Sequence, residues 1–401
     1  MSMKRIKFLL LSLAAASLTT SAQKEADYNN IVSALVADCP EIKQFVATEK
    51  ADIESRAAGN ILENPTVEGQ HVWGREGTKY DIGVSQEFAW PGVYRARAKA
   101  LKAGIRASEL LEQSLVADKI LEIEQLVIDI VYQKKAVEIE SRILEHMTAL
   151  EKGNIEGYNH GELTLIDLKK VEIERIATAS ALREAKRKLD ELYTTLETAT
   201  GHHDCRTLIA GINEVPQASI LPESDYEQLI ENYDPRLAWL RAQNDAIRLD
   251  GKAEVLAARA PGFSLGYAFV SELGDSFNGL SASISLPVYS RRHTVASANA
   301  KALSVEIEAE TTRMTAIANM RSLRTSVTSM QAELNDYNTV FGDDDYAHLL
   351  TIARQGGELS NLQYLQELNF FLDAARSRLA LEHEYVRSLA ALNRFRTISD
   401  R

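Results

Sequence analysis

The sequence lacks several features that mark enzymes, nucleic-acid binders and helical membrane proteins. After its first segment it has no apolar run of about 18 residues, so no membrane-spanning helix is expected. Its formal net charge of -12 argues against nucleic acid as a partner, because phosphate binding needs a basic surface. The 8 histidines are scattered, no nucleophile motif stands out, and no glycine-rich phosphate loop follows a strand. We therefore predict a protein that is not an enzyme and carries no cofactor.

Cysteine is also scarce, with 2 in 401 residues. Cys39 and Cys205 either form one disulfide in an oxidising compartment or remain two free buried thiols. With Cys205, the nearby His202 and His203 supply soft and imidazole ligands that suit zinc or copper. Adjacent side chains rarely converge on one ion, so we prefer the interpretation of a polar loop without a metal.

The first 22 residues are typical of an export signal. A short basic region with Lys4 precedes a mostly apolar stretch at 8–18, and small residues lead to Ala22. The apolar stretch is too short to span a bilayer. We predict a signal peptide at 1–22, cleaved after Ala22, and hence an exported protein.

An internal repeat organises the rest of the chain. Three landmarks recur in the same order, separated by 195 or 196 positions. They are Pro40 and Pro235, Pro65 and Pro261, and the tetrapeptides that begin at Gly161 and Gly357. Ordered matches at one offset indicate a duplicated unit. We predict two structural repeats, at 23–217 and 218–401.

Each repeat shows the same succession of sequence periods. In the first we expect a helix, a strand pair at 66–88, a long helix at 92–152, a tip at 153–162 and a return helix at 163–199. In the second we expect a helix at 236–259, a strand pair at 262–288, a long helix at 290–355, a tip at 356–358 and a return helix at 359–397. At 1.5 Å per residue the two long helices would measure roughly 90 and 100 Å. Val116, Ile123 and Ile130 lie seven apart, which is the pattern of helices that supercoil around neighbours.

The strands alternate between apolar residues and small or polar ones. A one-residue slip would turn Lys79, Asp81 and Glu87 toward the apolar side, so the register is strongly set. Four strands cannot enclose a pore alone, and their unpaired edges would be costly in lipid. We therefore expect sister copies to close the sheet inside a membrane, although a soluble sandwich could bury the same faces. The predicted lipid-facing residues are Tyr80, Ile82, Val84, Phe88, Phe263, Leu265, Tyr267, Phe269, Leu280, Ile284 and Leu286.

The order helix, strand pair, long helix, tip and return helix, occurring twice, resembles the TolC family of outer-membrane efflux proteins. The likeness covers nearly all of the mature chain, and it is carried by the segments at 64–66, 85–97 and 285–289 and by the two Gly-Glu-Leu tips. The segment Gln86-Glu87-Phe88-Ala89-Trp90-Pro91-Gly92 looks most like the branch that serves cobalt-zinc-cadmium and copper-silver exporters. Many relatives in that branch are lipidated at an N-terminal cysteine, and this chain departs from that pattern.

The resemblance implies a mainly α fold with a small transmembrane β part. Long α-helical coiled-coil hairpins would form a trimeric tunnel, and four strands per chain would contribute to a 12-stranded barrel. It also implies three kinds of partner besides outer-membrane lipid: sister copies in a homotrimer, a periplasmic adaptor, and an inner-membrane transporter of the resistance-nodulation-division type. The protein would lie in the bacterial outer membrane with a large periplasmic part.

The tips are the candidate docking sites. Gly161 and Gly357 should end the outgoing helices, where glycine is the usual stop. The acids that follow them either complement a helix dipole or add contacts to an adaptor. The predicted docking residues are Gly161, Glu162, Leu163, Thr164, Gly357, Glu358, Leu359 and Ser360. Asp343, Asp344 and Asp345 either form an acidic ring at the entrance or belong to a solvated loop.

Together these features predict a passive exit duct of a tripartite efflux pump that conducts metal cations or small drugs. A periplasmic coiled-coil adaptor is the first alternative, but an adaptor should place small β-domains around one hairpin, whereas this chain has two hairpins. A metal-binding periplasmic protein centred on His202 to Cys205 is the second alternative.

Overall fold

A computed structural model describes residues 28–75, 77–216, 218–272, 274–287, 292–341 and 346–399. The predicted signal peptide at 1–22 lies outside these residues, and so do the predicted entrance acids Asp343, Asp344 and Asp345. The described chain is mainly helical with one four-stranded sheet, so the predicted class, mainly α with a small β part, is confirmed. None of the described helices is both long enough and apolar enough to cross a membrane.

The chain divides into two compact units. The helical unit comprises Met1–Ile42, Val116–Asn232 and Ile317–Arg401, and the sheet unit comprises Lys43–Leu115 and Tyr233–Ala316. Each unit takes segments from both sequence repeats, so the repeat boundary near residue 217 does not coincide with a division between units.

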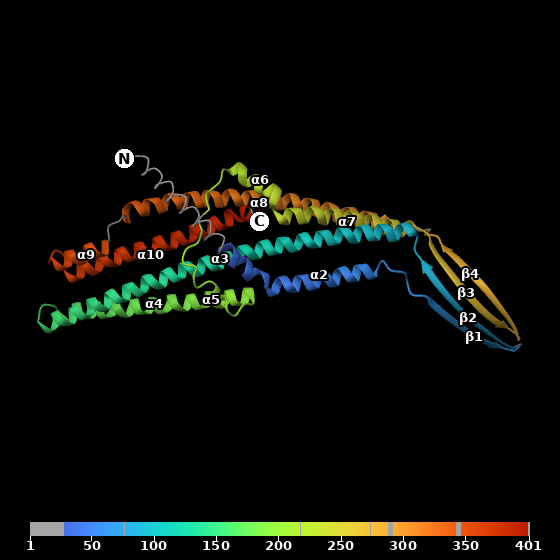
Figure 1. Cartoon of the computed structure of the whole chain (residues 1–401), viewed down its shortest axis with the longest axis horizontal. Coiled ribbons are helices and arrows are strands. Elements are labelled where there is room, and N and C mark those ends of the chain that lie inside the picture. Colours follow the sequence, from blue (N-terminus) through green and yellow to red (C-terminus); the bar gives the residue numbers. More distant parts are fainter. Residues whose placement is uncertain are drawn as a thin grey trace, which may run out of the picture. The chain divides into compact units, whose positions relative to one another are not determined.

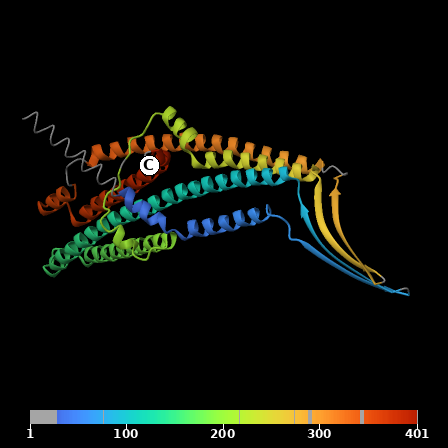
Figure 2. The same ribbon diagram turned by 45° about the vertical axis from the view of Figure 1, so that its right-hand side comes forward.

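The sheet unit contains one antiparallel sheet and the helix segments that lead into it (Figure 1). Its elements are most of α2 (Pro40–Ala58), β1 (Thr66–Gly74), β2 (Gly77–Phe88), the start of α3 (Pro91–Asn159), α7 (Pro235–Arg259), β3 (Gly262–Glu272), β4 (Asp275–Ser285) and the start of α8 (Arg292–Phe341). The strand order is β1-β2-β3-β4, so each repeat supplies one hairpin. The two hairpins are joined where β2 pairs with β3. Figure 2 shows the four strands as one curved ribbon.

The helical unit contains a helix at 28–37, the rest of α3 and α8, and the remaining helices. These are α4 (Leu165–Thr200), α5 (Cys205–Leu208), α6 (Glu223–Tyr233), α9 (Tyr346–Gln355), α10 (Asn361–Leu392) and α11 (Arg394–Ser399). Its core gathers fully buried side chains of the predicted seven-residue stripe, including Ile123 and Ile130, with Leu196 from α4. A second cluster packs α3 and α4 against α9 and α10 around Met147 and Tyr364.

Several predicted boundaries differ from the structure. The first long helix was expected to end at 152, but α3 continues to Asn159 with Gly153 and Gly157 inside it. Glycine lowers helix propensity without necessarily ending a helix, and the first glycine after the start of α3 with a positive φ is Gly161. The expected helix at 290–355 is described as α8 and α9, and the return helix at 359–397 is divided at Asn393 into α10 and α11. The helices at 28–37 and α6 were not predicted.

Candidate lipid-facing sheet and helix tips

The strand register sorts the sheet into one apolar and one polar face. Residues directly opposite each other in an antiparallel pair project to the same side. Ile82 lies opposite Phe269, and Tyr267 lies opposite both Val84 and Leu280. The same register places ten of the eleven residues predicted to face lipid on one side: Tyr80, Ile82, Val84, Phe88, Phe263, Leu265, Tyr267, Phe269, Leu280 and Ile284. Leu286, the eleventh, follows the end of β4 and is exposed. We call this side the apolar face.

The first strand adds residues to the apolar face that its sequence did not reveal. Thr66 to Trp73 alternates poorly, yet Val67 lies opposite Val84 and His71 lies opposite Tyr80. The His71 imidazole stacks on the Tyr80 ring at a centroid distance of 4.3 Å, which fits a polar ring into an aromatic surface. The face on which Val67 lies could have been predicted by pairing β1 with β2, because the alternation of β2 is clear whereas that of β1 is weak.

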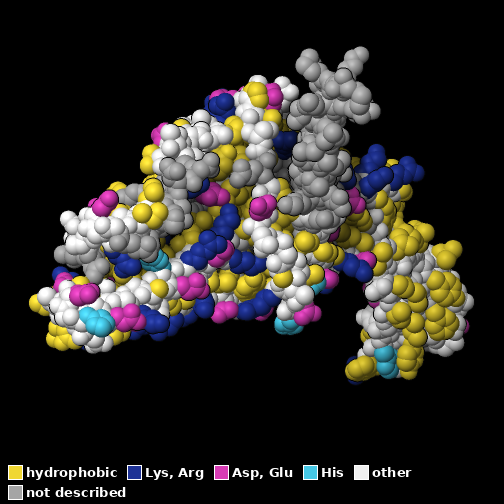
Figure 3. All heavy atoms as spheres, turned by 60° about the vertical axis from the view of Figure 1, so that its left-hand side comes forward, with side chains coloured by type: hydrophobic (Ala, Val, Ile, Leu, Met, Phe, Trp, Pro, Cys, Tyr) yellow, Lys and Arg dark blue, Asp and Glu magenta, His cyan; other side chains and the backbone are white. Residues whose placement is uncertain are grey.

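The large residues of the apolar face are open to solvent in the single chain. Leu280 is 90% exposed, Leu265 59% and Ile82 52%. Figure 3 shows this surface as a broad hydrophobic area. Contiguous exposed apolar surface on a folded chain marks contact with another protein or with lipid.

The opposite side, which we call the polar face, is built mainly from small and polar residues. Gly83, Ser85, Gly266 and Ser281 lie near its centre. A Cβ on Gly266 would come within 2.6 Å of the Ser281 Oγ and 3.0 Å of the Val84 carbonyl oxygen, so a larger residue would force these neighbours to move. Nearer the hairpin turns, Lys79 pairs with Glu272 at 3.5 Å.

The sheet has two open edges. β1 and β4 each pair with one neighbour, so their outer N–H and C=O groups have no strand partner among the described residues. An exposed strand edge is a template for pairing with another chain. The geometry therefore allows β1 of one copy to pair with β4 of the next.

The first helix tip is a tight, fully hydrogen-bonded turn. Gly161 has a φ of 77°, and its N–H donates to the Tyr158 carbonyl at 3.0 Å. The Glu162 N–H donates to the Gly157 carbonyl at 2.9 Å. This pair of bonds is the Schellman motif, which satisfies the last carbonyls of a helix. Leu163 folds back over Gly157, where a Cβ would lie 3.1 Å from the leucine Cδ1.

The second tip repeats the same backbone turn. Gly357 also has a φ of 77°, and its N–H donates to the Arg354 carbonyl at 3.1 Å. The Glu358 N–H donates to the Ala353 carbonyl at 2.9 Å. In both tips the glycine and the glutamate are exposed, the leucine is partly buried and the hydroxyl residue is exposed. The tetrapeptide repeat is therefore also a repeat of geometry and exposure.

Each tip hydroxyl caps the helix that follows. Thr164 Oγ1 accepts from the Asp167 N–H at 3.2 Å, and Ser360 forms a reciprocal capping box with Gln363. The side-chain hydrogen bond from Thr164 is the main cause of the lowered pKa of the Asp167 carboxyl. The two glutamates directly precede these capped helices and are exposed, a position open both to the helix dipole and to a partner protein.

No family model matches this sequence, and no curated protein matches it by sequence. Solved structures do match it in fold. The Vibrio cholerae outer-membrane protein VceC superposes with a TM-score of 0.73 at 14% identity, over 93% of this chain and 96% of VceC. The Campylobacter jejuni CmeC outer-membrane channel gives 0.71 at 16%, over 92% and 85%. The open state of the Neisseria gonorrhoeae MtrE outer-membrane channel gives 0.63 at 15%, over 93% and 87%. This chain has the fold of these outer-membrane proteins.

Ionic contacts between α3 and α10 join the two hairpins of the helical unit. Arg376 of α10 makes two hydrogen bonds to the Glu140 carboxylate, at 2.7 and 2.9 Å, and Glu140 is buried. Glu382 accepts from the Tyr132 hydroxyl at 2.8 Å and pairs with Lys135 at 3.2 Å. Burial and the Glu382 contact raise the pKa of the Tyr132 hydroxyl well above its usual range. Sequence reasoning missed these pairs, because partners more than 200 positions apart leave no local signal.

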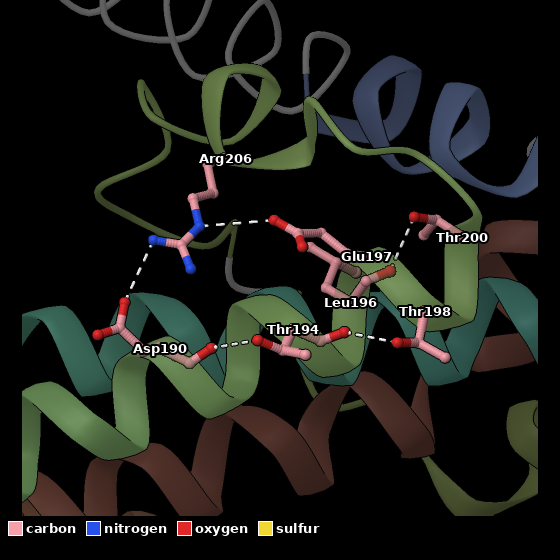
Figure 4. A network of polar contacts seen from close by, with 7 residues as sticks. All are labelled: Asp190, Thr194, Leu196, Glu197, Thr198, Thr200 and Arg206. Atoms are coloured by element: carbon pink, nitrogen blue, oxygen red, sulfur yellow. Dashed lines mark hydrogen bonds and ion pairs between the residues drawn. The ribbon is translucent and has the colours of Figure 1, made fainter.

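The segment at 202–205 does not form a metal site. No group of three or more histidine, cysteine or acidic side chains in the described part of the chain could hold a metal ion. His202 lies 3.6 Å from the Asp38 carboxylate, and Arg206 bridges Asp190 at 3.2 Å and Glu197 at 3.5 Å, which fastens the segment to α4 (Figure 4). The structure thus ties this segment to α4 through polar contacts and does not bring His202, His203 and Cys205 together with a further ligand among the described residues.

Cys39 and Cys205 are free thiols, both buried. The Cys39 Sγ donates to the Ala199 carbonyl at 3.2 Å, whereas Cys205 belongs to the hydrophobic core of the helical unit. Of the two alternatives, the disulfide is not present and the pair of buried thiols is. Burial is the main cause of the raised pKa of Cys205.

Proposed function

We propose that this protein is an exit duct of the TolC family, set in the bacterial outer membrane as a homotrimer and passively conducting substrate from an efflux pump. One observation carries the proposal: a four-stranded sheet with an exposed apolar face, a polar opposite face and two unpaired edges. The fold likeness to outer-membrane channels over more than nine-tenths of the chain supports it.

Closure by three copies satisfies the physical requirements of the sheet. Pairing of β1 with β4 between copies would remove both open edges, which lipid does not tolerate. The strands of 9 to 12 residues have the length that tilted strands need to cross a bilayer. The apolar face would contact lipid, and the polar face would line a wet passage.

The remaining parts fit transport and not catalysis. The helical hairpins end in two alike, exposed tips, which we propose as docking points for a periplasmic adaptor that links the duct to an inner-membrane transporter of the resistance-nodulation-division type. Metal cations, as in the heavy-metal branch that the sequence resembles, and small drugs are the two proposed classes of cargo. The partner transporter would supply the energy.

Fractionation combined with size measurement tests the proposal. The protein should remain with outer membranes, require detergent for extraction, and then have the mass of three chains by light scattering. Planar bilayers that contain the extracted protein should show discrete conductance steps. Release by osmotic shock as a monomer would contradict the proposal.

Neutralising the tip acids tests the docking role separately. Glu162→Gln with Glu358→Gln should weaken capture of the adaptor and leave the conductance of the trimer unchanged. Glu156 is exposed one turn before the first tip, so Glu156→Gln is the matched control. Equal adaptor capture by the tip variant and the control would remove the glutamates from the interface.

A further inference from the structure

A stripe of cations follows one side of α3 where it leaves the sheet. Arg95, Lys99, Lys102 and Arg106 recur at i, i+4, i+7 and i+11, which is the spacing of a single helix face. All four are exposed, and residues 91–108 contain no acid. Arg106 pairs with Glu109 at 3.1 Å, whereas the first three have no ionic partner among the described residues.

This stripe lies on the side of α3 away from the groove between the helices of the sheet unit. Arg97, Leu101, Gly104 and Ser108 line that groove with α2, α7 and α8. These groove residues have the same spacing as the cations, but each lies two residues further along the chain than a cation. Two residues correspond to a rotation of about 200° around the helix axis. The cations therefore lie on the outer side of the helices, opposite the groove.

A second basic row lies on the outer side of α7. Arg248, Lys252 and Arg259 line a shallower groove of about 780 Å³ between α7 and α8, whereas Asp250 and Glu254 line the opposite groove shared with α2 and α3. Arg248 pairs with Glu306 at 3.0 Å, while Lys252 and Arg259 are exposed and have no ionic partner among the described residues.

Apolar residues also line this outer groove. Val255, Leu256, Val295 and Leu303 are among its lining residues. α7 and α8 approach closely there, because a Cβ on Gly251 would lie 2.6 Å from the Ala298 Cβ. The groove thus combines cations with a hydrocarbon surface.

The outer groove adjoins the apolar face within the sheet unit. Trp90, which follows β2, packs at 5.7 Å from Phe263 of the apolar face. A Cβ on Gly92 would contact both Trp90 and Leu256, the latter at 3.6 Å, and Leu256 lines the outer groove. Apolar strand surface, aromatic ring and basic groove are continuous, and Figure 3 shows Lys and Arg side chains beside the hydrophobic sheet.

We infer that Arg95, Lys99, Lys102, Lys252 and Arg259, together called the basic belt, bind the headgroups of anionic phospholipid in the leaflet at the helical end of the sheet. The inference rests on the proposed membrane location. Arg95 to Lys102 covers about 10 Å of helix axis, which is comparable to the interfacial layer of a bilayer. The phosphate would contact the cations, and the first part of an acyl chain would lie on Leu256 and Val295.

Lipid selectivity tests the inference. The probes are phosphatidylglycerol and phosphatidylcholine with the same acyl chains, added to detergent-extracted wild-type protein and counted by native mass spectrometry. Wild type should prefer phosphatidylglycerol by about tenfold or more, and the preference should fall with added salt. The belt variant Lys99→Gln, Lys102→Gln, Lys252→Gln should lose most of the preference.

A control of equal charge change separates the belt from general electrostatics. Lys170→Gln, Lys186→Gln, Arg187→Gln removes three exposed cations from α4 in the helical unit, and it should keep the wild-type preference. Equal preference in the belt variant and wild type would overturn the inference. A wild type with no lipid preference, whose belt variant instead loses the trimer, would also overturn it and assign the groove to a neighbouring copy.

Conductance distinguishes the inference from the proposed function. Wild type and belt variant should both insert into phosphatidylcholine bilayers and conduct equally. Conduction without lipid preference would overturn only the inference that the basic belt binds lipid. Failure to insert into any bilayer would overturn both the proposed function and that inference.

Discussion

The sheet unit and the helical unit treat large apolar residues in opposite ways. In the helical unit Ile123, Ile130 and Leu196 have no exposed surface. In the sheet, Leu280 and Ile82 are 90% and 52% exposed although they belong to regular, hydrogen-bonded strands. The helices bury their hydrophobic residues within one chain, whereas the strands leave theirs for an environment that the chain does not supply. The same chain is thus built for two different surroundings.

A cation on the apolar face should have the largest effect. Ile82→Lys would put an ammonium into lipid in every copy, at about 2–4 kcal/mol each near the bilayer midplane. Membrane-inserted trimer should fall strongly, as measured by extraction and semi-native electrophoresis. Ser85→Lys, on the polar face, is the control and should leave insertion intact. Equal loss in both variants would contradict the assignment of the faces.

Shortening a buried side chain of the helical unit should have the next largest effect, a loss of stability confined to that unit. Ile130→Ala is expected to cost about 2–5 kcal/mol, because it leaves a cavity in a closed core. Leu280→Ala removes an outward side chain and should leave the helical unit unchanged. Hydrogen exchange of α3 measures the difference, and similar exchange in both variants would weaken the comparison between the units.

The two tip glycines should have a moderate effect. Gly161→Ala and Gly357→Ala each force a side chain into positive φ, which costs about 1–2 kcal/mol. Gly153→Ala is a matched control, since Gly153 lies inside α3 with open space at its Cβ, and it should stabilise by about 0.5–1 kcal/mol. Thermal unfolding compares the three. Stabilisation at either tip would show that the turn is not retained.

Acid should weaken the helical unit slightly, through His146. Burial, followed by the nearby Arg354 charge, lowers the pKa of this imidazole, which contacts the Tyr364 hydroxyl. The unfolded chain therefore binds the proton more readily, so stability is full above the ordinary pKa of about 6.5 and declines as pH falls below it. His146→Phe should flatten this part of the pH profile in urea titrations. An unchanged profile would assign the acid sensitivity to other groups.

The predictable parts of the fold were those with strong local periods. Alternation in β2, β3 and β4 was sufficient to sort residues such as Ile82 and Leu265 to one face, and the seven-residue stripe identified Ile123 and Ile130 as core. β1 was poorly predicted, since its faces are fixed by pairing with β2 and not by its own sequence. The Gly-Glu-Leu repeat located both turns, because only glycine readily adopts the required φ.

Contacts between distant segments were beyond the sequence. Nothing near Glu140 or Arg376 indicates that they meet, because the register of α3 against α10 is set by packing along both helices. The end of α3 was misplaced for a related reason: Gly157 is retained inside the helix to make room for Leu163, a residue beyond the turn.

Glycine and serine on the polar face have a consequence for the width of the proposed passage. Side chains this short keep the wall close to the backbone, whereas Glu68 and Asp81 on the same face would extend further into the passage. At Gly266, which lies close to Ser281 and the Val84 carbonyl, even one methyl group would require the neighbouring atoms to move. Where the side chains are short, the wall would offer little to distinguish one passing molecule from another, so selection at this level would fall to the longer acidic side chains.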